Sequence, residues 1–264
     1  MSVADPSPDI RPSAEPKYSR SLEFGLAIIG CFTVARPVWR VSELADMIKV
    51  SRSTTHRYAM TLVELGYLEQ DKSRRYRLAR RVCDPGIAFI NTLRMETPTA
   101  RTILEDLREA TGHTVSMGVL DGTRVLYTYR LFAHGRGQHE ADLGLDIGAS
   151  VPVYCTAIGK ALLASLSAAD QRKTIARLKL TAQGPNTITD KVVLVDNLLA
   201  VHAVSLAVCD EEQAPNVRSI AAAITHAERS QPMAISVTVP AKRMSLVAMR
   251  TKLGPQVLAA AERI

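Results

Sequence analysis

Apolar residues recur at helical spacing along the first third of the chain. Between residues 22 and 32 they lie three or four positions apart, which predicts an amphipathic helix over 21–33, with Pro37 just beyond it. The same period over 41–48 predicts a second helix of two turns. Ser51 is a favourable N-cap for a third helix, which carries an apolar stripe and ends at Gly66. The pattern therefore predicts a helix, a tight turn and another helix in close succession.

Short extended runs replace the helical period after Gly66. Residues 67–70 and 75–78 flank the polar turn 71–74, which predicts a β-hairpin. A helical apolar period then begins at Val82, and Pro98 ends it. We therefore expect a linker helix over 82–97.

Helices and strands are mixed in the rest of the chain. Asp121-Gly122 lies between two alternating apolar runs, which is a strong hairpin signal. The remaining pattern predicts helices over 101–111, 156–166, 192–203 and 246–263, strands over 114–120, 124–129, 151–154, 219–225 and 234–239, and a loop over 132–140. Hairpins combined with terminal helices predict the α+β class.

Composition limits the class of protein. The chain has 264 residues, of which 47% are hydrophobic, which is enough to build proper cores. No apolar stretch approaches the roughly 20 residues of a membrane span, and the N-terminus lacks a basic region followed by an apolar one. We therefore expect a cytoplasmic protein without a membrane partner. Residues 1–17, rich in Pro, Ser and Asp, are expected to be a disordered tail.

The four cysteines are far apart and form no metal-binding pattern. Cys31, Cys83, Cys155 and Cys209 include no CxxC pair, so neither a zinc site nor a disulfide framework is expected. We expect reduced thiols, mostly buried, and no cofactor.

The positive charge is concentrated in one segment. Residues 17–82 hold thirteen Lys and Arg against six Asp and Glu, so they alone carry the whole chain's net charge of +7. A localised basic balance favours an anionic partner, although a solvated basic face is the ordinary alternative.

The helix that begins after Ser51 has the chemistry of a DNA-reading helix. Hydroxyls, two guanidinium groups and an imidazole fall in its first two turns, and no Asp or Glu occurs over 50–63. Its positive N-terminal end is therefore available to phosphates. Thr55 is expected to face inward, which leaves five residues facing out. We assign base contacts to Ser53, Thr54 and Arg57, phosphate contacts to Ser51 and Arg52, and a less specific place on the same face to His56.

The predicted hairpin adds a second basic surface. Six Lys and Arg occur within residues 72–81, which suits a wing that lies along phosphates or in the minor groove. From the hairpin itself we assign Lys72, Arg74, Arg75 and Arg77 to DNA binding. A helix-turn-helix followed by a basic wing predicts a protein that binds double-stranded DNA.

These residues resemble a known family. Ser42-Glu43-Leu44-Ala45, the run over 51–57 and Leu65-Gly66-Tyr67-Leu68 are similar to the winged helix-turn-helix of IclR-type bacterial transcriptional regulators. In the second half, the segment 157–164, Asp210-Glu211-Glu212, the run over 217–222 and Ala234-Ile235-Ser236-Val237-Thr238 continue the resemblance in order. Tyr154-Cys155-Thr156 is most similar to the branch that responds to aromatic acids such as protocatechuate and 4-hydroxybenzoate.

The resemblance implies the organisation of the whole chain. It implies a winged helix-turn-helix domain over 18–81, a linker helix over 82–97 and a GAF-like effector-binding domain over 98–264. It further implies a homodimer that pairs through the DNA-binding domains, or a tetramer made of two such dimers, on a palindromic or repeated operator beside a catabolic operon. A small organic acid, in this branch an aromatic carboxylate, is implied as the effector.

The effector site implied by the resemblance falls on residues from several elements. They are Val151, Ala157, Ile158, Cys209, Asp210, Ser219, Ser236 and Thr238. Alternation along a strand places Ser236 and Thr238 on one face, and the amides that open a helix can bind a carboxylate. The alternatives are a solvated strand face for the two hydroxyls and ordinary packing for the helix start.

Three other functions compete with a ligand-responsive regulator. Cys155 lies near a helix N-terminus, where its pKa would fall, so a cysteine hydrolase is one. No motif ties a His to it, and no catalytic residue is assigned. A metal sensor using His113, His134 and His139 is the second, but the spacing does not suit tetrahedral ligands, and no metal is expected. The third is a constitutive DNA-binding repressor that takes no ligand.

Overall fold

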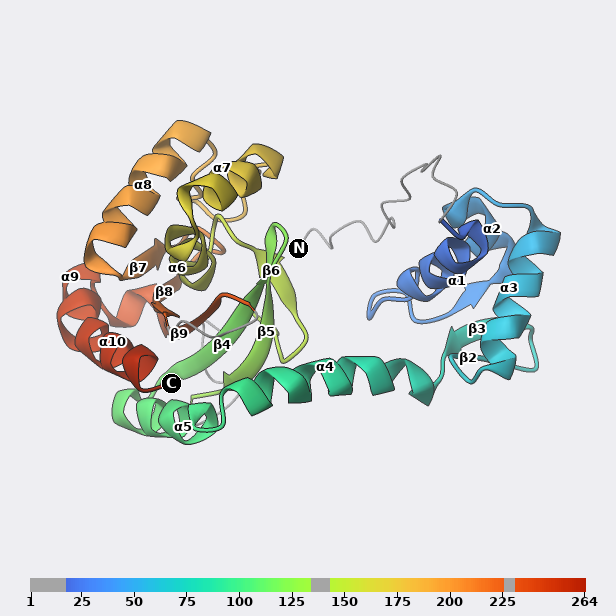
Figure 1. Cartoon of the computed structure of the whole chain (residues 1–264), viewed down its shortest axis with the longest axis horizontal. Coiled ribbons are helices and arrows are strands. Elements are labelled where there is room, and N and C mark those ends of the chain that lie inside the picture. The colour runs from blue at the N-terminus through green and yellow to red at the C-terminus, as the bar shows by residue number, and fades with distance from the viewer. Residues whose placement is uncertain (1–17, 134–142, 226–230) are drawn as a thin grey trace. The chain divides into compact units, whose positions relative to one another are not determined.

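The computed structural model describes residues 18–133, 143–225 and 231–264. The chain divides into two compact units, residues 1–91 and 92–264, each of which is described by itself (Figure 1). The tail predicted for residues 1–17 and most of the loop predicted for 132–140 lie outside the described residues. Within the described ranges, no helix has both the length and the apolar character needed to cross a membrane.

The first unit is a three-helix cluster with a small antiparallel sheet. Its elements are α1 (Arg20–Gly30), β1 (Trp39–Arg40), α2 (Val41–Ile48), α3 (Arg52–Glu64), β2 (Leu68–Gln70) and β3 (Arg75–Leu78), and the strand order is β1-β3-β2. The core is formed by fully buried side chains from every layer, among them Ile28, Leu44, Ala59 and Tyr76. The predicted helix-turn-helix and hairpin are confirmed. The strand β1 was not predicted, because two residues are too few for an alternating pattern.

The connection to the second unit is helical. A 3₁₀ turn, η1 (Arg80–Val82), leads into α4 (Cys83–Glu96), so the helix predicted over 82–97 is present. The boundary between the two units falls within α4, after Asn91.

The second unit is a six-stranded antiparallel sheet with helices on both faces. Its helices are α5 (Ala100–Thr111), α6 (Ala157–Ser165), α7 (Ala168–Arg177), α8 (Lys191–Val204), α9 (Leu246–Ala248) and α10 (Gly254–Arg263). Its strands are β4 (Thr114–Asp121), β5 (Arg124–Leu131), β6 (Ser150–Pro152), β7 (Ala207–Asp210), β8 (Val217–Ile224) and β9 (Met233–Pro240), in the order β6-β5-β4-β9-β8-β7. The α+β class is therefore confirmed.

Each face of the sheet builds its own core. On one face α5 and α10 pack against alternate residues of the central strands, including Val115, Ile235 and Val237. On the other face α6 packs against the sheet and α8 packs against α6 (Figure 1). That second core contains Ile158, Leu162 and the smaller strand residues. Because side chains alternate along a strand, a residue next to Ile235 or Val237 faces α6.

Two helical predictions were incomplete. The polar helix α7 was not predicted, because Ile175 is its only buried residue and provides no apolar period. Its N-cap Ser167, which accepts from Asp170 N, was the available signal. The single helix predicted over 246–263 is instead α9, a π-helical turn (Met249–Leu253) and α10. Pro255 lies in the first turn of α10, where its missing N–H costs no hydrogen bond and its ring prevents a continuous helix.

Candidate functional site

The first turn of α3 is held by its own hydroxyls. Ser51 is the N-cap, and its Oγ accepts from Thr54 N at 3.2 Å and donates to Thr54 Oγ1 at 2.8 Å. Ser53 Oγ lies 3.1 Å from Ser51 Oγ. The first turn contains no acidic residue, so no carboxylate neutralises the positive end of the helix.

The exposed face of α3 matches the predicted DNA-reading residues with one exception. Arg52, Ser53, His56 and Arg57 are exposed, and Thr55 is fully buried as expected. Thr54 is half-buried and its hydroxyl is bonded to Ser51, so it does not face out as freely as predicted. The N-cap geometry explains this, because the third helical residue must fold back toward the cap.

The wing turn is organised by a single carboxylate. Asp71 accepts from Ser73 N at 2.8 Å, from Arg75 N at 2.9 Å and from Arg75 Nε at 2.9 Å. The hydrogen bond from the Arg75 backbone, followed by the Arg75 side chain, lowers the pKa of the Asp71 carboxyl. Arg74 takes the left-handed conformation, with φ of 56°, at the tip of this turn.

The four predicted wing cations are therefore not equivalent. Arg75 is paired with Asp71, and Arg77 Nε lies 2.8 Å from Glu69 Oε1. Lys72 and Arg74 are exposed, and neither forms an ion pair with any other residue in the described part of the chain. Sequence reasoning treated all four alike, because the contact of Asp71 with Arg75 in the turn and that of Glu69 with Arg77 across the strands are visible only in the folded hairpin.

An apolar groove of about 510 Å³ opens on the first unit. It lies between α1, the C-terminal half of α3 and the start of α4, and exposed leucines line it. Leu22 is 63% exposed, Leu26 60% and Leu65 48%. Exposed side chains of this size in one groove are typical of a surface that another protein covers.

The predicted effector residues on the central strands gather in one place. The register pairs Cys209 with Ser219 and Ser219 with Thr238, so these three form a row across β7, β8 and β9. Ser236 faces the same side, two residues along β9. Ser219 is 7% exposed and Ser236 is 3% exposed, and neither hydroxyl oxygen is among the fully buried side-chain atoms that lack a hydrogen-bond partner. Polar groups on one side of a largely apolar surface are suited to orienting a small ligand.

Two of the predicted effector residues have other roles. Asp210 points to the opposite side of β7 from Cys209, and its Oδ1 accepts from Arg218 Nε at 2.5 Å. Arg218 also donates to two backbone carbonyls beyond β9, so Asp210 holds a structural network. Val151 lies on the edge strand β6, buried in the apolar core under α6.

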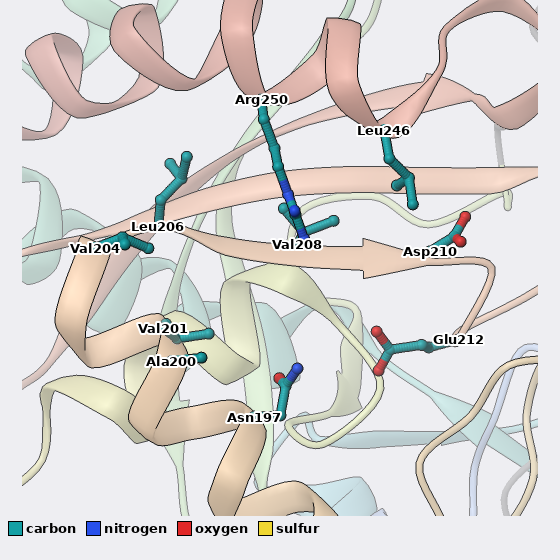
Figure 2. Close-up of a pocket in the computed structure, with 10 residues that line it drawn as sticks. All are labelled: Asn197, Ala200, Val201, Val204, Leu206, Val208, Asp210, Glu212, Leu246 and Arg250. Carbon is teal, nitrogen blue, oxygen red and sulfur yellow. The ribbon is translucent and has the colours of Figure 1, made fainter.

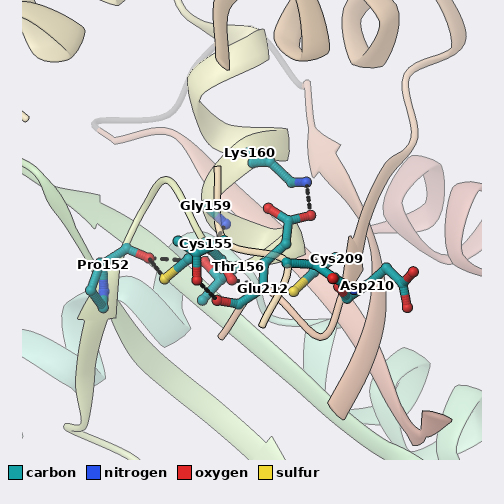
Figure 3. Close-up of polar contacts among 10 residues, drawn as sticks. Pro152, Cys155, Thr156, Gly159, Lys160, Cys209, Asp210 and Glu212 are labelled. Atoms are coloured by element: carbon teal, nitrogen blue, oxygen red, sulfur yellow. Dashed lines mark hydrogen bonds and ion pairs between the residues drawn. The ribbon is translucent and has the colours of Figure 1, made fainter. Parts of the chain in front are cut away.

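The first turn of α6 connects the start of the helix to strands on both sides (Figure 3). Thr156 is the N-cap, with its Oγ1 accepting from Gly159 N at 3.1 Å and donating to the Pro152 carbonyl at 3.1 Å. A Cβ on Gly159 would collide with the backbone of Val153, so only glycine permits this approach. Ala157 and Ile158 are fully buried here, and the first amides of a helix have no acceptor within it.

The next residue of α6 forms a buried ion pair. Lys160 Nζ lies 2.5 Å from Glu212 Oε1, with the Lys160 side chain fully buried and that of Glu212 8% exposed. Burial raises the pKa of Glu212, while the charge of Lys160 acts in the opposite direction. The other carboxylate oxygen, Oε2, is buried without a hydrogen-bond partner. This pair joins α6 to the segment that follows β7.

The cysteines near α6 are unreactive rather than activated. Burial, with smaller contributions from Cys209 and Glu212, raises the pKa of Cys155 to about 12. Burial likewise raises the pKa of Cys209 to about 11. Cys209 Sγ donates to the Cys155 carbonyl at 3.2 Å. The lowered pKa expected for Cys155 at a helix N-terminus is therefore wrong, because desolvation outweighs the helix dipole, and the cysteine hydrolase loses its nucleophile.

Sequence reasoning missed two polar residues on the α6-facing side of the sheet. Ser116 on β4 pairs with Ser236 on one side and with Arg130 of β5 on the other. Ser116 is 1% exposed and Arg130 is 8% exposed. The available signal was a single arginine at an inward position of the strand Val125-Leu126-Tyr127-Thr128-Tyr129-Arg130-Leu131.

A separate hollow of about 550 Å³ lies beside the outer edge of β7 (Figure 2). Apolar side chains of α8, β7 and α9 form most of its lining, together with Asn197 and Arg250. Of the predicted effector residues only Asp210 reaches it, and the buried acid at its rim, Glu212, is already paired with Lys160. The predicted effector residues therefore mark the surface under α6 rather than this hollow.

The metal-sensor alternative rests partly on residues that the structure does not describe. His134 and His139 lie outside the described ranges. Among the residues that are described, no group of three His, Cys, Asp or Glu side chains is arranged to hold a metal ion.

Comparison with known proteins identifies the family. Residues 21–72 match the IclR helix-turn-helix domain, and residues 96–264 match the domain described as bacterial transcriptional regulator IclR C-terminal. The Pca regulon regulatory protein of Pseudomonas putida is 27% identical over 259 residues, which is 98% of this chain and 87% of that protein.

Two solved structures share the fold. The IclR family transcriptional regulator from Brucella abortus aligns with a TM-score of 0.78 and 19% identity, covering 99% of this chain and 97% of that one. An IclR homologue from Microbacterium hydrocarbonoxydans, crystallised in complex with 4-hydroxybenzoate, aligns with a TM-score of 0.74 and 21% identity over 91% of this chain and 95% of that one. Family members are regulators and not enzymes. The chain belongs to the IclR family of bacterial transcriptional regulators.

Proposed function

We propose that this chain regulates a catabolic operon by binding a palindromic or repeated DNA operator in a manner controlled by a small aromatic carboxylate. The observation that supports DNA reading most strongly is the acid-free start of α3, with Arg52, Ser53 and Arg57 exposed on one face. Ser51, the N-cap of α3, contacts a phosphate at the start of the helix. Arg57, further along the exposed face, contacts a base edge, and Lys72 and Arg74 provide the unpaired phosphate contacts of the wing.

The DNA assignment is tested by separating base contacts from phosphate contacts. The operator is first selected from random duplexes with the purified protein, and affinities are then measured by fluorescence anisotropy at several salt concentrations. Arg57→Ala should cost about 1–3 kcal/mol at one operator position and relax specificity there. Arg74→Ala should weaken all sequences alike and lower the salt slope by about one.

Arg172→Ala, on α7 of the other unit, is the matched control and should leave both quantities unchanged. Equal losses on operator and random duplexes for Arg57→Ala would refute its base contact. An unchanged salt slope for Arg74→Ala would remove the wing tip from the interface.

The apolar groove on the first unit supports pairing of two chains through their DNA-binding units. A two-fold dimer buries the same groove on both copies and presents two copies of α3 to repeated half-sites. Leu26→Asp should convert the dimer to a monomer in light scattering and weaken operator binding. Val34→Asp, at a more exposed apolar position outside the groove, should leave the dimer intact. A dimer that persists in Leu26→Asp would place the interface elsewhere.

The effector is proposed to lie between α6 and the polar row on the sheet. The support is the pair of buried serines, Ser219 and Ser236, with Thr238 and Cys209 beside them and the amides of Ala157 and Ile158 at the start of α6. The Microbacterium homologue was crystallised with 4-hydroxybenzoate, which favours an aromatic acid. The helix amides are suited to a polar oxygen of such a ligand.

A thermal-shift screen with aromatic and short aliphatic carboxylates tests the effector site. A ligand that binds only the folded state raises its stability by RT ln(1 + [L]/Kd), about 2.7 kcal/mol at one hundred times Kd. Ser236→Ala should weaken the shift and the operator response to the acid while sparing operator affinity without it. Operator binding that no carboxylate alters would instead support the constitutive repressor.

A further inference from the structure

A cation lies buried inside the second unit, and no acid among the described residues is paired with it. Arg130, on β5, is only 8% exposed. Its guanidinium lies over the rings of Tyr127 and Phe132, at 5.2 Å and 5.4 Å from their centroids, and its Nη1 is 3.5 Å from Ser116 Oγ. The side chain is therefore held in place by aromatic faces rather than by a carboxylate.

Arg130 has no counter-charge among the described residues. No Asp or Glu lies within ion-pair distance of Arg130 in the described part of the chain, and its Nε is buried without a hydrogen-bond partner. The guanidinium group of arginine is charged in proteins, so this cost is not relieved by loss of the charge. A buried charge without a partner is strongly unfavourable. The positive charge of Arg130 therefore favours the binding of an anion beside it.

The position of Arg130 connects it to the proposed effector surface. The register pairs Arg130 with Ser116 and Ser116 with Ser236, so the three form a row across β5, β4 and β9 on the side facing α6. The row of Thr238, Ser219 and Cys209 runs beside it, two residues along the strands. By this register the Arg130 side chain lies on the same side of the sheet as these hydroxyls.

We propose that Arg130 binds the carboxylate of the effector, with the hydroxyls of Ser116 and Ser236 donating to the same group. The inference rests on the proposed effector site and specifies its chemistry. Nε and an Nη of one guanidinium match the two oxygens of a carboxylate, a geometry that lysine cannot reproduce. The site accordingly selects small anions with a carboxylate and rejects amides and esters of the same shape.

The test uses the full-length protein and pairs of probes that differ only in charge. Benzoate, 4-hydroxybenzoate and 3,4-dihydroxybenzoate are titrated by calorimetry beside their neutral carboxamides. At least one acid should bind, and its amide should not. Arg130→Gln should lower the affinity for the acid by about 10- to 100-fold, the effect of losing charge-assisted hydrogen bonds. Arg130→Lys should retain only part of the parent's affinity. Arg124→Gln, on the same strand but bonded to Ser150, is the control and should bind as the parent does.

A second measurement needs no ligand. Because a buried cation with no acid beside it among the described residues is unfavourable, Arg130→Met should melt at the same temperature as the parent protein or higher, whereas replacing an arginine with a structural role would lower the melting temperature. A melting temperature several degrees lower for Arg130→Met would overturn the proposal. So would acids that bind the parent and Arg130→Gln equally, a result that leaves the effector site itself standing. Absence of binding by every acid to the parent would overturn both proposals.

Discussion

The buried ion pair between α6 and the segment after β7 allows a quantitative prediction. Lys160→Met removes one charge and leaves the Glu212 carboxyl inside the protein without a partner. The pair is at 2.5 Å, with Lys160 fully buried and Glu212 8% exposed, so solvent cannot replace the lost charge. Removing one member of such a pair costs about 3–5 kcal/mol. For a unit of this size, that corresponds to a fall of roughly 6–20 °C in melting temperature.

The protein contains its own reference for this measurement. Trp39 is the only tryptophan, and it is buried in the first unit. Tryptophan fluorescence therefore follows unfolding of residues 1–91, whereas far-UV circular dichroism follows both units. Lys160→Met should lower the circular dichroism transition of the second unit and leave the fluorescence transition where it is. Lys173→Met, at an exposed position on α7, is the matched control and should change neither.

A double variant separates the pair from mere packing. Lys160→Met with Glu212→Leu removes both charges, so it should recover most of the loss or exceed the parent, because a buried ion pair adds little over apolar residues of similar volume. A fall of less than about 3 °C for Lys160→Met, roughly 1 kcal/mol, would refute the estimate. A double variant as unstable as the single one would show that shape rather than charge holds α6.

Three further predictions concern single residues. Ser51→Ala should lower the fluorescence transition of the first unit by about 4–8 °C, the effect of losing an N-cap worth about 1 kcal/mol, and an unchanged transition would contradict the cap. Gly159→Ala should destabilise the second unit by about 1–3 kcal/mol, because the added Cβ would collide with the backbone of Val153. Gly86→Ala is the control: its Cβ would meet open space in α4, so this variant should be neutral or stabilising. Equal melting temperatures for the two variants would refute the close approach at Gly159. A thiol reagent at pH 8 should label only the exposed Cys83 rapidly, and fast labelling of more than one thiol would contradict the burial of the others. Burial raises the pKa of Cys155 from 9.0 to about 12, so the folded state keeps the thiol proton to a higher pH than the unfolded state does. The free energy of unfolding should therefore fall as pH rises above 9.

The sequence was sufficient for most of the fold because periodic burial determines it. The helix-turn-helix and the hairpin at Asp121-Gly122 are each predicted by a pattern of a few neighbouring residues. The π-helical turn before Gly254 and the strand β1 are not predicted by such a pattern, because each depends on contacts with distant parts of the chain. Local signals existed for α7 but were outweighed by its lack of an apolar stripe.

The site was predicted less completely, and for a related reason. Residue type and resemblance selected Ser219, Ser236 and the face of α3 that is exposed in the structure. They could not show that Arg75 is neutralised by Asp71, nor that Asp210 is engaged by Arg218, because both depend on which side chains meet across strands. Nor could they single out Arg130, because only the fold shows that no acid among the described residues lies beside it.

The start of α6 also sets how the second unit can deform. β6 and β7 are the two outermost strands of the sheet, and α6 is fixed close to both, through Gly159 against Val153 just after β6 and through Lys160 to Glu212 just after β7. The first turn of α6 thus links the two edges of the sheet and limits how far the two edge strands can move apart. A molecule that enters beneath α6 must either fit the space between these edges or displace one of them. Such a displacement would reach α5 and α10 on the other face as a change in the surface on which they pack.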